Sequence, residues 1–261
     1  MKQLILVMSL FFITQGIYAN EEYLSWQKIE KEFEKLNLNT KALSHVQCFF
    51  SEHENTVFRK KVSFDDSGLN RCSGDSSITI DSKRIFAIID YTKDSDEKRM
   101  YLVDRLTGKI TPMAVAHGRF KAGFLNPRVS FLKNSVSKSR YYSNEMNSNA
   151  PSSGFFIAGI KYDGKFKQSL TLHGLEESIN DNACERAVVI HKHLLVSNNR
   201  AYVLSSGCPM VSRKNIDQVI NALRSKEDIN GNVEKNGGLV FIYGEREKNW
   251  PQLSCPGSFN L

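Results

Sequence analysis

A cysteine between a glycine and a proline is the sharpest candidate for chemistry in this chain. The segment Ser205-Ser-Gly-Cys-Pro-Met210 follows a short apolar run and places Cys208 on a tight turn that a substrate can approach. The thiolate is the reactive form of cysteine, so a nucleophilic Cys208 needs a base or a positive local field nearby. His191 ends the preceding apolar run and is our candidate base, with His193 as the second choice.

Strand geometry gives a test of the spacing between His191 and Cys208. If Asn198-Asn199 form the tip of a hairpin, antiparallel pairing places His191 opposite Ser206. Residues two apart on a strand share a face, so His191 and Cys208 would point to the same side, about 7–8 Å apart at their Cβ atoms. A shift of the tip by one residue weakens this pairing.

The same segment limits how an oxyanion could be stabilised during acyl transfer. Pro209 has no N–H, so any backbone donors must come from Cys208 and the residues before it. Gly207 lets the backbone approach closely, and Ser205 and Ser206 offer hydroxyls that can donate or orient the base. The alternative for Cys208 is half of a disulfide at a turn, which is more common for a lone Gly-Cys-Pro in an exported protein.

The N-terminus predicts export. Lys2 precedes an apolar run from Leu4 to Ile17, and Tyr18-Ala19 leads into a polar stretch. This pattern is typical of a secretory signal over residues 1–19, cleaved after Ala19. A retained anchor is the alternative, but the run is short for a bilayer, and no later stretch approaches the ~20 apolar residues of a membrane helix. We therefore expect a periplasmic or secreted protein that is not stably inserted in a membrane.

The cysteine count supports a reactive thiol. The five cysteines are Cys48, Cys72, Cys184, Cys208 and Cys255. In an oxidising compartment four of them can close two disulfides, which leaves one over. The local sequence favours Cys208 as the remaining thiol. The other four allow three connectivities, of which Cys48–Cys72 with Cys184–Cys255 is our working guess.

Charge and motif content exclude several other classes of function. The formal net charge is +7 for the whole chain, and loss of Lys2, the one charged residue of the signal, reduces it by one to +6. The basic residues are spread along the chain, which suits a polyanionic surface such as a cell wall and argues against a nucleic-acid partner. The sequence contains no HxxxH zinc spacing, no Gly-rich phosphate loop and no GxSxG elbow. We therefore expect neither a metal nor a cofactor.

The sequence around these residues predicts a mostly-β protein with helices near the two ends of the chain. Residues 21–53 have helical spacing, with a second segment from Thr40 to Ser51 in which Thr40 is a candidate N-cap. From residue 77 short β-like runs alternate with turn residues, and residues 104–109 resemble a hairpin turn. A Ser- and Asn-rich stretch, residues 135–153, predicts a long loop, and a late helix spans residues 214–225 after Ser212 as N-cap. Examples of the β-like runs are residues 84–90, 100–104, 154–158, 186–191, 201–205 and 238–243.

An ordered series of motifs gives these observations a family context. The chain contains, in this order, Ala116-His-Gly118, Tyr142-Ser-Asn144, Ser152-Ser-Gly154, Ser169-Leu-Thr-Leu-His-Gly-Leu-Glu176, Asn180, Ala183, Arg186-Ala-Val-Val-Ile-His191 and Ser205-Ser-Gly-Cys-Pro209. Over roughly residues 77–243 this series resembles the murein L,D-transpeptidase catalytic domain family, a branch of the YkuD-like transpeptidases. The resemblance implies a β-sandwich or barrel catalytic domain. We place its boundaries at 77–247, after a helical segment and linker at 20–76 and before a tail at 248–261.

The resemblance also implies a reaction and a substrate. Cys208 would attack the carbonyl of the diamino acid in a tetrapeptide stem of peptidoglycan, with His191 as base, and release the terminal D-Ala. Transfer of the acyl group to a neighbouring stem makes a 3→3 crosslink, and transfer to water makes the site an L,D-carboxypeptidase. The motif positions add four candidate substrate-binding residues, although an isolated His-Gly is more often structural: His117, Asn144, Ser153 and His173.

The chain also departs from the family pattern at the site. Lys192 stands where family members tend to have Gly, and Val203, Leu204 and Ser206 replace the Arg or His that usually surrounds the Gly-Cys pair. These departures bear on substrate specificity more than on the chemistry, and they leave open a catalytically degenerate protein that only binds peptidoglycan.

Overall fold

The computed structural model describes residues 23–53, 55–60, 72, 76–80, 84–122, 131–132, 134–226, 230 and 235–245. The expected signal peptide, the C-terminal tail and Cys255 lie outside these residues. Within the described ranges, no helix has the length and apolar character needed to cross a bilayer.

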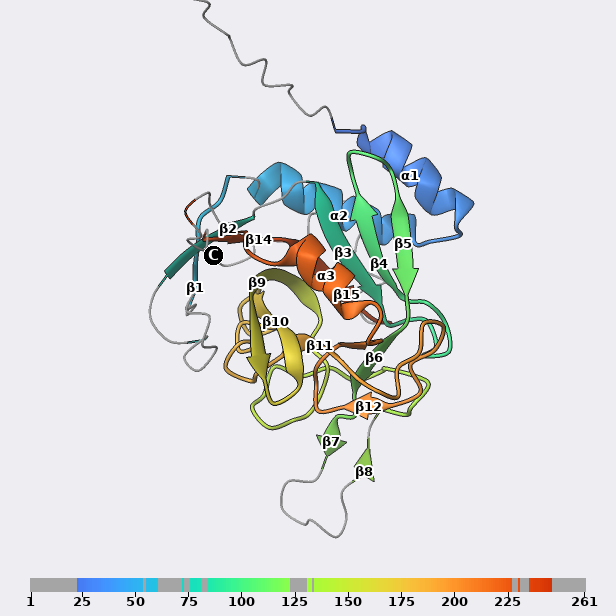
Figure 1. The fold of residues 1–261 in the computed structure, drawn as a ribbon, viewed down its shortest axis with the longest axis vertical. Helices are drawn as coiled ribbons and strands as arrows, with labels where there is room; N and C mark the ends of the chain where they lie inside the picture. The colour runs from blue at the N-terminus through green and yellow to red at the C-terminus, as the bar shows by residue number, and fades with distance from the viewer. Residues whose placement is uncertain are drawn as a thin grey trace, which may run out of the picture.

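A large mixed sheet organises the described part of the molecule (Figure 1). Ten strands belong to it, and its short strands β12, β6, β13 and β11 carry the candidate site at one end of the strand order. Across the sheet the order is β12 (Leu204–Ser205), β6 (Val115–Gly118), β13 (Met210–Val211), β11 (Val189–Lys192), β10 (Lys167–Gly174), β9 (Gly154–Gly164), β15 (Leu239–Tyr243), β3 (Ile85–Asp90), β4 (Met100–Asp104) and β5 (Ile110–Met113).

Smaller elements surround this sheet. A three-stranded sheet contains β1 (Phe58–Lys60), β2 (Ser76–Ile80) and β14 (Asn236–Gly237), and a two-stranded ribbon contains β7 (Lys121–Ala122) and β8 (Phe131–Leu132). The ribbon projects from the body of the molecule at the bottom of Figure 1. The helices of the described residues are α1 (Trp26–Lys35), α2 (Thr40–His53) and α3 (Ile216–Leu223).

Helices cover both faces of the sheet, which explains why its central strands are apolar on both sides. Along β3, Phe86 and Ile88 belong to a buried cluster with α1 and α2, whereas Ala87 and Ile89 belong to a second cluster with α3. This alternation follows from the two-residue period of a strand. The N-terminal helical segment therefore shares a core with the sheet, and α3 contacts β3, β9 and β10 on the other face.

The predicted fold class is confirmed: the chain is mostly β, with a curled ten-stranded sheet, an N-terminal helical segment and one late helix. Strands occur in all six predicted runs. The hairpin turn at 104–109 is also confirmed, because the Asp104 N–H donates to the carbonyl of Lys109 and Gly108 has a φ of +73°. Residues 134–153 form no regular element, in agreement with the predicted loop.

The two predicted helix caps are wrong by a few residues. The Asn39 side chain accepts the backbone N–H of Lys41 at 3.0 Å, so Asn39 caps α2 and Thr40 is already helical. The late helix begins at Ile216 with Asn215 in the N-cap position. The Ser212 hydroxyl is 3.0 Å from Asn198 Oδ1, which draws it away from the helix.

Candidate active site

The turn that carries Cys208 depends on a glycine. Gly207 has a φ of +117°, and a Cβ at this position would lie 2.9 Å from the carbonyl oxygen of Ala150. The Gly207 N–H donates to Ser205 Oγ at 3.0 Å, which closes the turn and occupies one of the backbone donors expected to be available for an oxyanion. Ser206 is exposed. This turn therefore fixes the approach of the chain to Cys208.

Cys208 carries a thiol, as expected from the cysteine count. The residue is 7% exposed, and its Sγ donates to the carbonyl of Ala187 at 3.4 Å. Ala187 lies two residues before β11, the strand that contains His191. The thiol is thus held against the segment that leads to the candidate base.

His191 is a buried imidazole with a defined proton position. Its Nδ1 lies 3.0 Å from the carbonyl oxygen of Lys192, and a carbonyl only accepts, so Nδ1 carries the hydrogen and Nε2 keeps its lone pair. Burial lowers the pKa of His191; the hydrogen bond to Lys192 opposes this effect, and the charge of His193 adds to it. The neutral imidazole is the form that can accept a proton.

The predicted hairpin between His191 and Cys208 is wrong. Strands β11 and β13 are parallel, and His191 is paired with Met210, not with Ser206. A turn does form at residues 197–200, but the chain then adds β12 to the far side of β6, where Leu204 is the partner of His117. It returns to β11 only at Pro209, whose carbonyl accepts the His191 N–H at 3.2 Å. His191 is thus hydrogen-bonded to the residue that follows Cys208.

Two arginines that the sequence did not single out as site residues hold the turn in place. Arg119 donates to the Ser205 carbonyl through Nε at 3.2 Å and to Ser206 Oγ through Nη2 at 2.5 Å. Arg186 donates to the Ala150 carbonyl at 2.7 Å, directly behind Gly207. Arg119 follows the Ala116-His-Gly118 motif, and Arg186 begins the Arg186–His191 motif. Their positions in the ordered series were the signal that could have identified them as site residues.

Comparison with family models decides the affiliation of this site. The model described as L,D-transpeptidase catalytic domain matches residues 62–229, more than half of the chain. The chain belongs to the L,D-transpeptidase catalytic domain family. Membership of this family supports a function in the modification of peptidoglycan. No curated protein matches the chain.

The chain also has low similarity to several solved structures. An L,D-transpeptidase from Mycobacterium smegmatis is 11% identical, with a TM-score of 0.35 over 67% of this chain and 64% of that protein. The helical cell shape determining protein Pgp2 from Campylobacter jejuni is 13% identical, with a TM-score of 0.31 over 62% of this chain and 49% of Pgp2. An L,D-transpeptidase from Stackebrandtia nassauensis is 11% identical, with a TM-score of 0.32 over 83% of this chain and 76% of that protein. The alignments thus span less than two thirds of the first two proteins.

Several motif residues of the L,D-transpeptidase series are buried and hydrogen-bonded to one another. The Asn180 amide donates to the carbonyls of Ser153 and Phe155 at 2.9 and 3.0 Å, and its Oδ1 accepts the Glu176 N–H at 2.9 Å. Glu176 in turn accepts the Phe155 N–H, and a Cβ on Gly154 would collide with the Glu176 carboxylate. These positions therefore fix the loop and strand that flank the site.

Three of the four expected substrate-binding residues, His117, Ser153 and Asn144, belong to the hydrogen-bonded structure that supports the site, which we call the frame. His117 is 0% exposed; its Nδ1 accepts from Arg99 Nη2 at 2.7 Å and its Nε2 donates to the Ser135 carbonyl at 3.0 Å. Ser153 is 4% exposed, and the Asn144 side chain donates to Asp181 Oδ1 at 2.6 Å. Both ring nitrogens of His117 are therefore used within the protein.

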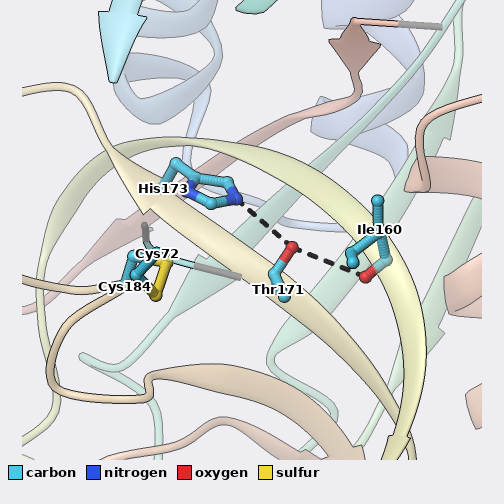
Figure 2. Close-up of a disulfide and its surroundings, with 5 residues drawn as sticks. All are labelled: Cys72, Ile160, Thr171, His173 and Cys184. Atoms are coloured by element: carbon cyan, nitrogen blue, oxygen red, sulfur yellow. Dashed lines mark hydrogen bonds between the residues drawn. A yellow bond between two sulfur atoms is a disulfide. The ribbon is translucent and has the colours of Figure 1, made fainter. Parts of the chain in front are cut away.

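His173, the fourth of these residues, lines a pocket together with Cys184 of a disulfide. Figure 2 shows its ring pointing toward Thr171. Its Nε2 is 3.3 Å from Thr171 Oγ1, which also reaches the Ile160 carbonyl at 3.4 Å. The pocket has a volume of about 200 Å³. Its lining comprises Arg59, Lys60, His173, Gly174, Asp181, Asn182, Cys184 and Glu185.

The guessed disulfide connectivity is wrong. Cys72 is bonded to Cys184, so neither Cys48–Cys72 nor Cys184–Cys255 forms. Cys48 is itself disulfide-bonded. Spacing alone could not find this pairing, because Cys72 and Cys184 are 112 positions apart and meet only through the fold. Among the described residues, no group of three or more His, Cys, Asp or Glu side chains is placed to hold a metal ion.

Proposed function

We propose that this chain is a peptidoglycan L,D-transpeptidase that acts through a Cys208 thioester. Its donor is a tetrapeptide stem, its first product is the terminal D-Ala, and its second product is a 3→3 crosslink. We place this activity in the periplasm or at the cell wall after removal of residues 1–19. The reaction needs a nucleophile and a base, and the chain offers Cys208 and His191 for these roles. The proposed reaction uses no cofactor.

The proton position of His191 is the observation that carries the proposal. Because Nδ1 donates to the Lys192 carbonyl at 3.0 Å, Nε2 is the atom that can take a proton from a neighbouring thiol. The hydrogen bond from the His191 N–H to the Pro209 carbonyl ties the base to the residue after Cys208. This pair of backbone contacts orients the base relative to the nucleophile without a third side chain.

The acylation step follows from these roles. The Cys208 thiol gives its proton to His191 Nε2, and the sulfur forms a bond to the carbonyl carbon of the diamino acid. The tetrahedral intermediate then collapses with cleavage of the C–N bond to D-Ala. The imidazolium returns its proton to the departing amine, so His191 is neutral again beside a thioester.

The second step regenerates the thiol. An amine on a neighbouring stem attacks the thioester carbonyl, loses a proton to His191 and releases the Cys208 sulfur, which takes that proton back. Water in place of the amine gives a tripeptide and makes the same site a carboxypeptidase. The choice depends on how well an acceptor excludes water from the acyl-enzyme.

We assign the remaining predicted site residues to support and binding. Ser205 and Gly207 form the turn that presents Cys208, with Ser206 held by Arg119. His117, Ser153 and Asn144 belong to the frame because their polar atoms are buried or bound within it. His173, at the wall of the pocket, is the candidate of the four that remains for substrate contact.

Incubation of sacculi with the purified, oxidised protein tests the proposal. After digestion of the sacculi, mass spectrometry should find free D-Ala together with new 3→3 dimers, and Cys208→Ala should give neither while it melts like the parent. Release of D-Ala with tripeptides and without dimers would identify the carboxypeptidase. A protein that retains sacculi and forms no product at all would be the binding-only alternative.

A matched pair of histidine variants tests the assignment of the base. His191→Ala should reduce D-Ala release by about 100-fold or more, as expected for loss of a general base. His193→Ala is the control, because His193 Nδ1 accepts the Leu195 N–H within its own turn and should not serve the reaction. Loss of activity in the control and its retention in His191→Ala would reverse the two roles.

A further inference from the structure

Arg186 is a half-buried cation whose guanidinium donates hydrogen bonds to neutral oxygens. Nη1 donates to the Ser143 carbonyl at 2.5 Å and to Ser152 Oγ at 2.6 Å. Nη2 donates to the Ala150 carbonyl at 2.7 Å and to Ser148 Oγ at 3.2 Å. Within the described part of the chain, no carboxylate forms an ion pair with it. Its positive charge is therefore fixed in place without being neutralised.

The position of this charge relates it to Cys208. A Cβ on Gly207, the residue before Cys208, would be 3.7 Å from Arg186 Nη2. Ala187, the residue after Arg186, accepts the Cys208 thiol at 3.4 Å. Burial lowers the pKa of Arg186, and the charge of the Cys208 thiolate acts in the opposite direction. Because a coulombic interaction is mutual, the guanidinium stabilises the thiolate as the thiolate stabilises the guanidinium.

The state of His191 shows why such a charge is needed. Burial lowers the pKa of this imidazole, which makes it a weak base for a thiol. A weak base can take the proton only if the anion left behind is stabilised, and a guanidinium stays protonated at any pH of interest.

We propose that Arg186 is the positioning residue of the nucleophile: its guanidinium stabilises the Cys208 thiolate that forms when the thiol proton passes to His191. The four hydrogen bonds to residues 143–152 hold the charge at the turn and keep it from moving to solvent. This inference deepens the proposed function and rests on it in taking Cys208 as the nucleophile.

The pH dependence of Cys208 alkylation in the oxidised full chain tests this role without any substrate. Iodoacetamide reacts with the thiolate, and peptide mapping restricts the reading to Cys208. Arg186→Met and Arg186→Gln should move the alkylation midpoint upward by about one unit, so that modification at a pH below both midpoints slows about tenfold. Arg186→Lys keeps the charge and should retain most of the parent rate.

Ser152→Ala is the matched control, because it removes one hydrogen bond of Arg186 and leaves the charge. Its midpoint should equal that of the parent. The proposal is overturned if folded Arg186→Met and Arg186→Gln keep the parent midpoint, or if Ser152→Ala shifts it as far as they do. If the neutral variants do not fold, Arg186→Lys decides: a parent midpoint supports the role of the charge, and a midpoint raised by about one unit overturns it. The proposed function fails separately, through an active Cys208→Ala in the sacculus assay.

Discussion

The ring of Phe166 lies flat against the imidazole of His191, with the ring centroids 4.2 Å apart and an angle of 14° between the planes. Phe166 is at the tip of the β9–β10 hairpin and is 44% exposed, whereas His191 is 2% exposed. An exposed aromatic side chain from a hairpin thus covers one face of the candidate base. This cover contributes to the burial that keeps the imidazole neutral.

Removal of this cover should change the pH range of activity. In Phe166→Ala water reaches the imidazole, the burial effect weakens and the pKa of His191 rises toward its ordinary value. The base works only when neutral, so the acid-side fall in kcat/KM for D-Ala release should move to higher pH. Phe166→Trp preserves the stacking and should keep the parent profile. An unchanged acid limb in Phe166→Ala would show that Phe166 does not screen the base.

The buried pair Arg99 and His117 should make stability depend on pH. Burial, and then the charge of Arg99, lowers the pKa of His117 from 6.5 to about 3. The unfolded chain therefore binds the additional proton between these values, and stability is present above pH 6.5 and is lost as the pH falls toward 3. The expected slope from this group is about 1.4 kcal/mol per pH unit.

Urea unfolding of His117→Asn between pH 7 and pH 4 tests this slope. The variant should lose about 1–3 kcal/mol at pH 7, because Arg99 loses an acceptor for its buried Nη2. Its pH dependence should be smaller than that of the parent by up to one proton. The contributions of His45, His53 and His191 remain in both proteins, so the difference isolates His117. Equal slopes would contradict the assignment.

Two glycines of positive φ should separate strain at the site from strain elsewhere. Gly207→Ala should cost about 1–3 kcal/mol and abolish most D-Ala release, since its Cβ meets the Ala150 carbonyl and displaces Cys208. Gly108→Ala, with a φ of +73° in the β4–β5 turn, should cost a similar amount and remain active. Denaturant unfolding and the D-Ala assay provide the two readings. Equal loss of activity in both variants would remove the special role of Gly207.

The Cys72–Cys184 disulfide should stabilise the site as well as the fold. It joins residues 112 positions apart, and Cys184 precedes Arg186 and Ala187 on the same turn. The double variant Cys72→Ser/Cys184→Ser should lose about 2–5 kcal/mol of unfolding free energy. Its D-Ala release should also fall, because the segment that contacts Cys208 loses its covalent tie. A double variant as stable and active as the parent would rule out both effects.

The sequence predicted six of the strands, but it missed others of the main sheet such as β6 and β10, and it did not predict the strand order. Residues such as Phe86 and Phe155 mark strands because apolar side chains fill both faces of the sheet. The parallel pairing of His191 with Met210 depends on the insertion of β6 between β12 and β13, which is a long-range arrangement that no local pattern encodes. The predicted hairpin used only contacts between neighbouring segments, and it was wrong because the true pairing of His191 depends on β6, which is distant in the sequence.

A similar limit applies to the candidate site. Cys208 stood out through its flanking glycine and proline and through the odd cysteine count. Arg119 and Arg186 did not, because an arginine in a sequence has the appearance of a surface charge until its hydrogen-bond partners are known. The motif residues Glu176 and Asn180 were visible as a pattern, but only their contacts reveal that they support the frame.

The excursion of the chain between His191 and Cys208 separates loop length from chemistry. Residues 193–203 leave the sheet, and both ends of the excursion are secured by backbone bonds to β11, β13 and β6. The turn at 197–200 can therefore be lengthened or replaced while base and nucleophile keep their register. Leu194, Leu195 and Tyr202 are exposed on this segment. Residues 193–203 can thus vary while the strands that hold His191 and Cys208 stay fixed, and selection or design can change this segment without rebuilding the candidate site.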